Sequence, residues 1–420
     1  MKPTFVISCP FDTYSGYGAR SRDIIKAVLA TEKYDVKLYA QRWGNTPFGF
    51  CNDNPEWKHL MDLIVTEPLT TKPDVWMQIT IPNEFSPVGN YNIGVTAGVE
   101  TTLAPGDWVE GINRMDLTLV SSNHSKHVFL TSEFEKKDKE GNVINHIKVN
   151  KPIEVLFEGA NTTTYFSDDK QSLIDFNIPE SFAYLFVGHW INGDLGEDRK
   201  NVGLLVKAFY ETFKNKKSKP ALILKTSQVG SSYMDRDEIL RKINLIKQTV
   251  NSNDLPNIYL LHGDFSDKEM NSIYNHSKVK AMVSLTKGEG FGRPLLEFSL
   301  VKKPIIVSGW SGHMDFLSKD FNLLLGGQLN NVHHSAANQW LLAESQWFNP
   351  DHGQIGYALK DMFENYKKYT EGAKRQAFKS KNEFNWDKMK DLLSVLIEKY
   401  TPNRPKQISF SLPELETITL

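Results

Sequence analysis

Residues 288–297 read GEGFGRPLLE and contain two carboxylates, Glu289 and Glu297, eight positions apart. This stretch directly follows KAMVSL (280–285), an apolar run that is typical of a buried strand. Ligands of open α/β folds bind beyond the carboxyl ends of the parallel strands. The position of the stretch therefore predicts a ligand site, with Glu289 after the strand and Glu297 within the next helix.

The residues between the two acids favour the same interpretation. Gly290 and Gly292 have no Cβ, so backbone amides can approach a ligand closely. Pro294 suits the first turn of a helix, whose free amides and positive dipole end would face that ligand. The alternative is an acidic helix start that only complements the dipole. That alternative does not account for the glycine turn or for its position after a buried strand.

Strand-like and helix-like segments alternate along the chain in two successive series. This alternation predicts mostly parallel sheets with helices on both faces. Two doubly wound sheets are the simplest account of 420 residues, with a boundary near 170–180 in the stretch SDDKQSLIDFNIPESF. The expected strands are 4–8, 36–40, 74–80, 91–96, 117–122 and 153–157 in the first series, and 183–188, 221–226, 258–263, 280–285 and 303–308 in the second.

The composition is that of an ordinary globular protein. Hydrophobic residues make up 40% and charged residues 24%, and the net charge of −1 provides no strong attraction to nucleic acid or to an anionic membrane. Two cysteines, Cys9 and Cys51, cannot form a disulfide framework, which favours the cytoplasm, or a host cytoplasm if the protein is viral. No stretch approaches the roughly 20 apolar residues of a membrane span. Peripheral membrane contact and the oligomeric state stay open.

A second glycine turn, SGYGARSR (15–22), lies between an expected strand and an expected helix. Gly16 and Gly18 there would present helix-terminal amides to a phosphate. A dinucleotide-binding Rossmann turn also requires an acidic residue at the end of the second strand. That strand ends instead in Gln41 and Arg42, which disfavours a dehydrogenase. A tight structural turn is the alternative to a phosphate site.

The Glu-x7-Glu pattern with Gly-Phe-Gly inside it resembles the signature of retaining, nucleotide-sugar-dependent glycosyltransferases. Those enzymes have the GT-B fold, an α/β architecture in which two Rossmann-like domains face each other across a deep cleft. The resemblance covers most of the chain from about Leu117 onward. The other similar blocks are VLFEGANTTTYF (155–166), LFVGHWINGDLGEDRKN (185–201), IYLLHGDFSDKEMNSIY (258–274), KKPIIVSGWSGHMDFL (302–317) and FNWDKMKDLLSVLIEKY (384–400).

The resemblance also implies a division of the chain. Residues 1–175 are expected to form an acceptor-binding domain, completed by a crossover helix at 384–400 and a tail at 401–420 whose role is open. Residues 176–383 are expected to form the nucleotide-sugar-binding domain.

Transferred to the matching positions of this chain, the resemblance implies a donor site. Glu289 is expected to bind hydroxyls of the donor sugar, and Glu297 is expected to bind the ribose. The backbone around Phe291, Gly292 and Arg293 is expected to contact the sugar and the diphosphate.

The same resemblance places cations at the diphosphate. Lys200 stands where the family has its diphosphate-binding lysine, which suits a leaving group whose negative charge must be stabilised. The family usually has an arginine directly after the Val-Gly of this loop, but this chain has His189 there and Arg199 beside Lys200. We expect either His189 or Arg199 to supply the second positive contact.

Two further residues have open interpretations. Glu100, in GVTAGVETT, stands where related enzymes carry a histidine or a glutamate near the reacting carbon. A catalytic role for Glu100 competes with a helix-capping role before Pro105. His313 either contacts the donor or packs a turn.

Two metal-like features are interpreted as structural. Asp235 and Asp237 form an Asp-x-Asp pattern, but they directly precede an amphipathic helix, which favours N-capping. The His333–His334 pair has no partner cluster at metal-ligand spacing and is expected in a surface loop. No metal or other cofactor is expected to be required, because Lys200, a neighbouring cation and the amides of the first glycine turn can neutralise a diphosphate.

The sequence as a whole predicts a cytoplasmic glycosyltransferase that moves a hexosyl or pentosyl unit from a UDP- or GDP-linked sugar with retention of configuration. A glycan or lipid-linked sugar is the expected acceptor. A hydroxymethylated base in viral DNA is an alternative acceptor, whose phosphates a lysine stripe within 126–151 could follow. Two other classes are a sugar-nucleotide epimerase of the same fold and a non-catalytic binding protein, the latter disfavoured by the complete set of Glu289, Glu297 and Lys200.

Overall fold

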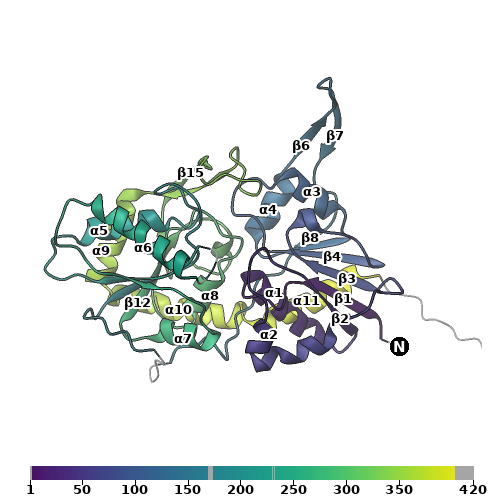
Figure 1. Ribbon diagram of the computed structural model, residues 1–420, viewed down its shortest axis with the longest axis horizontal. Helices are drawn as coiled ribbons and strands as arrows, with labels where there is room; N and C mark the ends of the chain where they lie inside the picture. Colours follow the sequence, from purple (N-terminus) through teal and green to yellow (C-terminus); the bar gives the residue numbers. More distant parts are fainter. Residues whose placement is uncertain (1, 169–173, 229, 231, 403–420) are drawn as a thin grey trace, which may run out of the picture.

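The computed structural model describes residues 2–168, 174–228, 230 and 232–402 and contains two six-stranded parallel sheets (Figure 1). The first sheet has the order β2–β1–β3–β4–β5–β8. Its strands are β1 (Thr4–Cys9), β2 (Asp35–Ala40), β3 (Val75–Ile79), β4 (Tyr91–Thr96), β5 (Leu117–Val120) and β8 (Ile153–Val155). The strand order reverses between β1 and β3, and such switch points are where open α/β sheets bind ligands.

The second sheet has the order β11–β10–β9–β12–β13–β14. Its strands are β9 (Ala183–Val187), β10 (Ala221–Lys225), β11 (Ile258–Leu261), β12 (Val279–Ser284), β13 (Ile305–Ser308) and β14 (Leu323–Leu325). This is the strand order of dinucleotide-binding sheets, and its switch point lies between β9 and β12.

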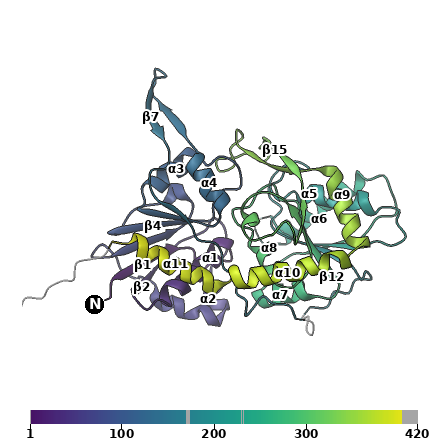
Figure 2. The ribbon, with the colours of Figure 1, turned by 180° about the vertical axis from the view of Figure 1, so that it is seen from behind.

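Helices cover both faces of both sheets (Figures 1 and 2). In the first half they are α1 (Gly16–Leu29), α2 (Phe50–Asp53), η1 (Pro55–Leu63), η2 (Pro82–Glu84), α3 (Gly106–Asn113) and α4 (Asn123–Thr131). In the second half they are α5 (Val202–Phe213), α6 (Tyr233–Gln248), α7 (Asp267–Asn275), α8 (Arg293–Ser299), η3 (Gly312–Asp315) and α9 (His352–Glu364).

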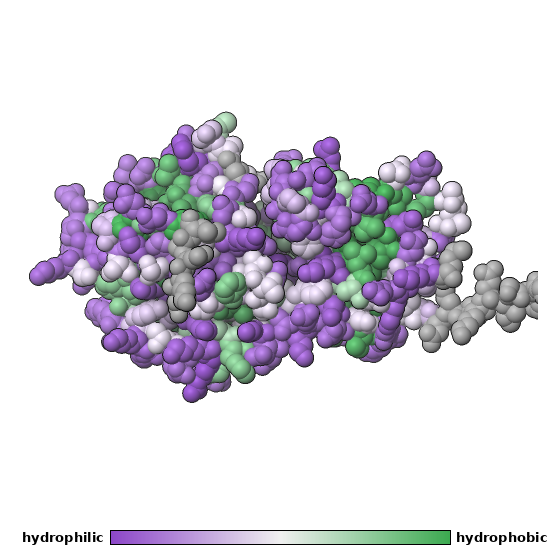
Figure 3. Space-filling model, turned by 90° about the horizontal axis from the view of Figure 1, so that it is seen from below, coloured by the Kyte–Doolittle hydropathy of each residue, from purple (hydrophilic) through white to green (hydrophobic). Residues whose placement is uncertain are grey.

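Alternation along the central strands builds the cores on the two faces of a sheet. On β1, Phe5 and Ile7 join a cluster that includes residues of α1, whereas Val6 joins a separate cluster that includes residues of α3 and α4. Successive side chains of a strand point to opposite faces, and buried parallel strands are therefore apolar on both. Hydrophilic residues predominate on the outer surface seen in Figure 3, where hydrophobic side chains gather in a few patches.

Two consecutive C-terminal helices connect the two halves, as Figure 2 shows. Helix α10 (Lys367–Glu383) packs on the second half, where Ser380 Oγ lies 2.7 Å from Ser299 Oγ of α8. Helix α11 (Trp386–Tyr400) packs on the first half and buries Met389, Leu393 and Ile397 in the core that contains α1. These three residues recur every fourth position and so form one stripe on the helix.

Two hairpins were not expected from the sequence. Strands β6 (Phe134–Lys137) and β7 (Val143–Ile147) project from the first half (Figure 1). Strands β15 (Gly327–Asn331) and β16 (Gln346–Pro350) form the second hairpin. Their alternation is weak, because β6, β7 and β15 are largely exposed and have no buried apolar face.

The predicted domain limits stay a proposal. The last strand of the first sheet ends at Val155 and the first strand of the second begins at Ala183, so the predicted limit at 175/176 falls between the sheets. Residues 169–173 of the predicted boundary stretch, and residues 403–420 of the predicted tail, lie outside the described residues. Within the described part of the chain, no helix is both long and apolar enough to cross a membrane.

Candidate active site

A cavity of about 510 Å³ lies between the two halves of the molecule. Its volume is within the roughly 300–1,000 Å³ range of small-molecule sites. Residues that follow β1, β2, β4 and β8 line it from the first half, and residues that follow β9, β10, β11 and β12 line it from the second. The cavity therefore lies at the carboxyl ends of both sheets and includes the loops at both switch points.

Lys200, Arg199 and Glu289 meet at the switch point of the second sheet. Lys200 Nζ lies 2.5 Å from Glu289 Oε1, and Arg199 Nη1 lies 3.6 Å from Glu289 Oε2. Arg199 Nη1 also lies 3.6 Å from Glu100 Oε1, which belongs to the first half. The three predicted catalytic residues, Glu100, Lys200 and Glu289, are thus brought together around Arg199.

The cations determine the charge of Glu289. Burial alone would raise the pKa of Glu289, but Lys200 and Arg199 lower it to about 2. Burial lowers the pKa of Lys200, and Glu289 opposes that shift. The short contact with Lys200 and the second cation beside it keep Glu289 ionised at neutral pH.

The start of α5 fixes the two cations in place. Asp198 accepts hydrogen bonds from the amides of Val202 at 3.0 Å and Gly203 at 3.4 Å. Asn201, the N-cap residue, has a φ of 59° and no capping hydrogen bond from its own side chain. Asp198 therefore caps the helix in its place and holds the Arg199–Lys200 segment between itself and the first turn.

The glycine turn after β12 packs against the first half. A Cβ on Gly288 would lie 1.8 Å from the carbonyl oxygen of Glu100, and one on Gly290 would lie 2.2 Å from that of Ala97. Ser121 Oγ also donates to the Gly290 carbonyl at 3.1 Å. Gly290, which was expected to let a ligand approach, therefore also lets the other half of the chain approach, and Gly288 does the same.

Of the residues at the end of this turn and in α8, some line the cavity and others point away from it. Phe291, Gly292 and Arg293 line the cavity, and Gly292 has a φ of 96°, a left-handed conformation that favours glycine. Glu297 does not line the cavity and instead accepts hydrogen bonds from Arg293 Nε at 2.9 Å and from the Tyr274 hydroxyl at 3.3 Å. The predicted ribose contact of Glu297 stays a prediction.

Arg293 is also a link between the two halves. Its Nη1 lies 2.7 Å from Asp23 Oδ2 on α1, so the guanidinium joins Glu297 of the second half to an acid of the first. Burial raises the pKa of Glu297 to about 7 even though Arg293 opposes the shift.

His189 lines the cavity, with Nδ1 3.2 Å from Ser227 Oγ. Burial, and then Lys200 and other nearby cations, lower the pKa of His189, so the imidazole is neutral at pH 7. Arg199 is the positive member of the predicted pair.

The first glycine turn differs from its prediction. Gly16 lines the cavity, but Gly18 is buried and its amide donates to Ser15 Oγ at 2.9 Å. Ser15, Gly16 and Tyr17 line the cavity and Gly18 does not, because Ser15 uses the Gly18 amide to cap α1.

Several capping and packing interpretations are resolved by the structure. Glu100 does not cap α3, whose N-cap is Pro105. Ser232, and not Asp235, caps α6, while Asp235 lies 2.7 Å from His262 Nε2. The N-capping prediction for Asp235 is therefore wrong.

His313 is fully buried, and its Nε2 lies 2.7 Å from the Ser308 carbonyl oxygen, which matches the packing alternative.

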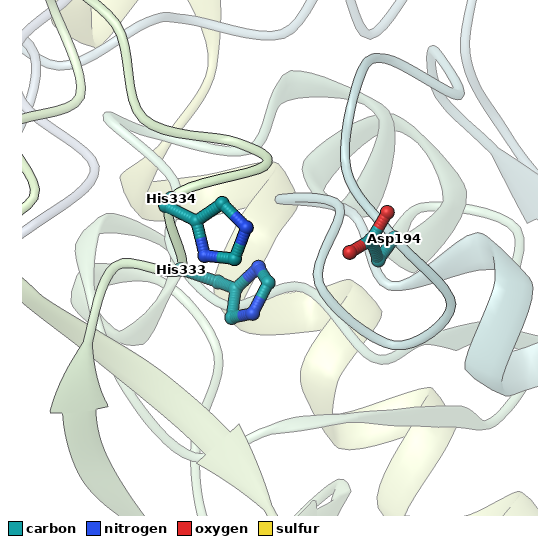
Figure 4. Close-up of side chains that lie close together, drawn as sticks. All are labelled: Asp194, His333 and His334. Atoms are coloured by element: carbon teal, nitrogen blue, oxygen red, sulfur yellow. The ribbon is translucent and has the colours of Figure 1, made fainter.

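The histidine pair has an acidic neighbour that sequence spacing did not reveal. Figure 4 shows His333 and His334 on one loop facing Asp194 on another, and their ligand atoms lie within 4.8 Å of one another. Asp194 and His334 are exposed, as expected for a surface loop, and none of the three lines the cavity.

The cavity-lining residues that were missed in the sequence include Tyr17, Arg20, Trp43 and Glu158. Glu158 lies inside the block VLFEGANTTTYF, so that resemblance was a signal that could have identified it. Trp43 follows a strand end in a loop without a recognisable motif, and only folding brings it to the cavity.

Solved structures match this chain over nearly its whole length. Sucrose-phosphate synthase from Thermosynechococcus elongatus is 12% identical, with a TM-score of 0.62 over 95% of this chain and 99% of that chain. HepE from Anabaena, in complex with UDP and glucose, is 12% identical, with a TM-score of 0.62 over 94% and 99%. A glycosyltransferase from Rickettsia africae ESF-5 is 13% identical, with a TM-score of 0.62 over 96% and 100%.

No protein-family model matches the sequence, and no curated protein matches it either. The structural matches establish the fold. The chain has the GT-B architecture, with two facing Rossmann-like halves, so the predicted fold class is confirmed.

Proposed function

We propose that this chain is a retaining glycosyltransferase that needs no metal. It would move a hexosyl or pentosyl unit from a nucleoside-diphosphate sugar to a hydroxyl of a glycan or lipid-linked acceptor, in the cavity between the halves. The observation that carries the proposal is the meeting of Lys200, Arg199 and Glu289 at the switch point of the second sheet. Similarity of fold to glycosyltransferases supports it.

The cations suit a departing diphosphate. Lys200 and Arg199 are held by the capped start of α5, so they would stabilise the developing negative charge with little reorganisation. The cavity-lining backbone from Phe291 to Arg293, together with Gly16, would add amide contacts. Arg199 is the second positive contact that we favour, because His189 is neutral.

The acids suit the sugar. Glu289 is ionised, and a carboxylate accepts hydrogen bonds from hydroxyl groups. Glu289 is also held by two cations, which makes it a poor nucleophile, so we propose a front-face displacement assisted by the departing phosphate. Glu100, linked to Arg199, would stabilise positive charge at the anomeric carbon or orient the acceptor.

Two further assignments complete the proposal. We favour UDP over GDP as the carrier because HepE, a structure of the same fold, contains UDP and glucose. We place the activity in the cytoplasm because Cys9 and Cys51 are both free and buried.

A panel of UDP- and GDP-linked sugars tests the proposal. The wild-type protein should release nucleoside diphosphate from at least one donor, and Lys200→Ala should lower that rate about a hundredfold or more, the usual effect of losing a charge-stabilising group. Lys217→Ala is the matched control, because Lys217 is exposed in a loop. Formation of an altered sugar nucleotide without nucleoside-diphosphate release would instead indicate an epimerase.

A further inference from the structure

The first half of the chain contributes an aromatic wall to the cavity. Tyr17 and Trp43 both line it, with ring centroids 3.9 Å apart and ring planes inclined by 24°. The Tyr17 hydroxyl lies 3.0 Å from Thr96 Oγ1 and accepts a hydrogen bond from the Ala97 amide at 3.0 Å, which fixes the ring. Trp43 is half-buried and rests on this fixed ring, so the wall is preformed.

Glu158 is a carboxylate on the same side of the cavity. It is 9% exposed and lines the cavity. Among the described residues it has no hydrogen bond and no ion pair, whereas Glu100, Glu289 and Glu297 each contact an arginine or a lysine. Burial raises the pKa of Glu158, although Arg20 and Arg293 oppose the shift. The oxygens of Glu158 are not among the buried, unpartnered side-chain atoms, so they are open to the cavity and can accept hydrogen bonds from a ligand.

The backbone on both sides of Glu158 is fixed. Arg20 Nη1 donates to the Phe157 carbonyl at 2.7 Å, and Nη2 donates to the Leu156 carbonyl. On the other side, the Ala160 amide donates to the Phe384 carbonyl at 2.9 Å. Arg20 is therefore a positioning residue that presents Glu158 to the cavity.

We propose that the aromatic wall and Glu158 together form the acceptor subsite, and that this subsite binds a carbohydrate. A sugar ring has an apolar face of C–H groups, which suits the indole of Trp43, and neighbouring hydroxyls, which suit the oxygens of Glu158. This inference rests on the proposed function, and it assigns the acceptor to Trp43, Tyr17 and Glu158 and the donor to the cation cluster around Arg199.

The charges on this wall disfavour a DNA acceptor. Among the described first-half residues that line the cavity, Arg20 is the one cation, and both of its Nη groups already donate to backbone carbonyls. The lysine stripe within 126–151 lies outside the cavity lining, and Lys126 pairs with Glu154 at 2.8 Å. A phosphodiester would meet Glu158, which has no ion-pair partner among the described residues, and Glu100, whose neighbouring cation Arg199 belongs to the donor side.

Two variants and a defined set of probes test the subsite. Glu158→Gln removes the carboxylate charge with little change in shape, and Trp43→Ala removes the aromatic surface. The probes are methyl glycosides of glucose, galactose, mannose and N-acetylglucosamine, and a DNA duplex that contains 5-hydroxymethylcytosine. Binding is measured by saturation-transfer NMR and transfer by acceptor kinetics, while UDP affinity and donor hydrolysis in water report on the donor side.

We expect at least one glycoside to bind and to accept the sugar. Glu158→Gln should raise its KM about tenfold to a hundredfold, the usual consequence of losing hydrogen bonds to a charged group. Trp43→Ala should also raise the KM. UDP affinity and donor hydrolysis should stay within twofold of wild type in both variants. Glu110→Gln, an exposed acid on α3, is the control that should change nothing.

The failures of the two proposals are distinguishable. The subsite is overturned if no glycoside gives a saturation-transfer signal, if both variants keep the wild-type KM, or if only the DNA duplex is glycosylated. The proposed function fails, in contrast, if the wild-type protein neither binds UDP nor consumes any sugar nucleotide. Glycoside binding that is lost in Glu158→Gln would still support the subsite in that case.

Discussion

The two glycine turns that face the cavity, 15–18 in the first half and 288–292 in the second, are alike in sequence but differ in use. In the first turn Ser15 caps α1, and its Oγ accepts the Gly18 amide at 2.9 Å. Gly16 has no atom within 4 Å of the position that a Cβ would occupy. The first turn is therefore capped by its own Ser15 side chain, and Gly16 has free space on the side of the cavity.

The second turn has the opposite character. Helix α8 begins after Gly292 without a side-chain cap, and the turn contains a charged residue, Glu289, bound to Lys200. Gly288 and Gly290 touch the backbone of the first half. Similar glycine patterns therefore serve helix capping in one half and contact between halves in the other, so a glycine motif alone does not identify a ligand contact.

Alanine in place of Gly288 should have the largest effect. The added Cβ would lie 1.8 Å from the Glu100 carbonyl oxygen, so the two halves must separate. Glu100 and Glu289 would then move apart, and a displacement of about 1 Å in an active site can lower the rate about a hundredfold. We expect Gly288→Ala to lower kcat by at least that factor, measured with the donor panel.

Gly16→Ala is the matched control in the other turn. Nothing lies near the added methyl group, so its kcat should stay within a few-fold of wild type. Small-angle scattering of the two variants would show whether only Gly288→Ala enlarges the molecule. Equal activity losses in both variants would contradict the difference between the turns.

The charge in the second turn should give it a pH-dependent stability. Glu289→Gln leaves Lys200 buried without its nearest acid, so the variant should be less stable at pH 7. The pKa of Glu289 falls from 4.5 to about 2 because Lys200 and Arg199 outweigh burial. A shift of that size corresponds to about 3 kcal/mol of unfolding free energy.

The direction of the pH effect follows from the lowered pKa. Glu289 stabilises the fold above pH 4.5, where it is ionised in both states, and this contribution is lost as the pH falls from 4.5 toward 2. The gap in unfolding free energy between wild type and Glu289→Gln should therefore narrow below pH 4.5 in urea titrations. A gap that stays constant from pH 7 to pH 3 would show that Glu289 is not held ionised.

Much of the fold could be predicted because its signals are local. The buried parallel strands are continuous apolar runs, and their spacing indicates two doubly wound sheets. The two hairpins were missed because β6, β7 and β15 are exposed and lack an apolar face. Helix α1 begins at Gly16, inside the stretch 15–22 that was expected as a turn before the helix, because Ser15 and not the apolar pattern determines its start.

A residue of the candidate site could be predicted only where it lies inside a recognisable sequence motif. Glu289 and Lys200 belong to such segments, and folding brings them to 2.5 Å. The Arg293–Asp23 ion pair joins residues far apart in the sequence, and nothing near either residue indicates the other. Trp43 belongs to no motif, and its contact with Tyr17 exists only in the folded chain.

The smallest expected effect belongs to the cap of the first turn. Ser15→Ala should remove the hydrogen bond to the Gly18 amide and lower the unfolding free energy by about 1 kcal/mol, the usual value of an N-cap. The freed amide would still be covered, because Gly18 is buried against Thr13. UDP affinity measured by calorimetry should therefore stay within twofold of wild type. A tenfold gain in UDP affinity would instead show that this amide can reach a phosphate, and the two turns would then differ only in how their amides are satisfied before the donor binds.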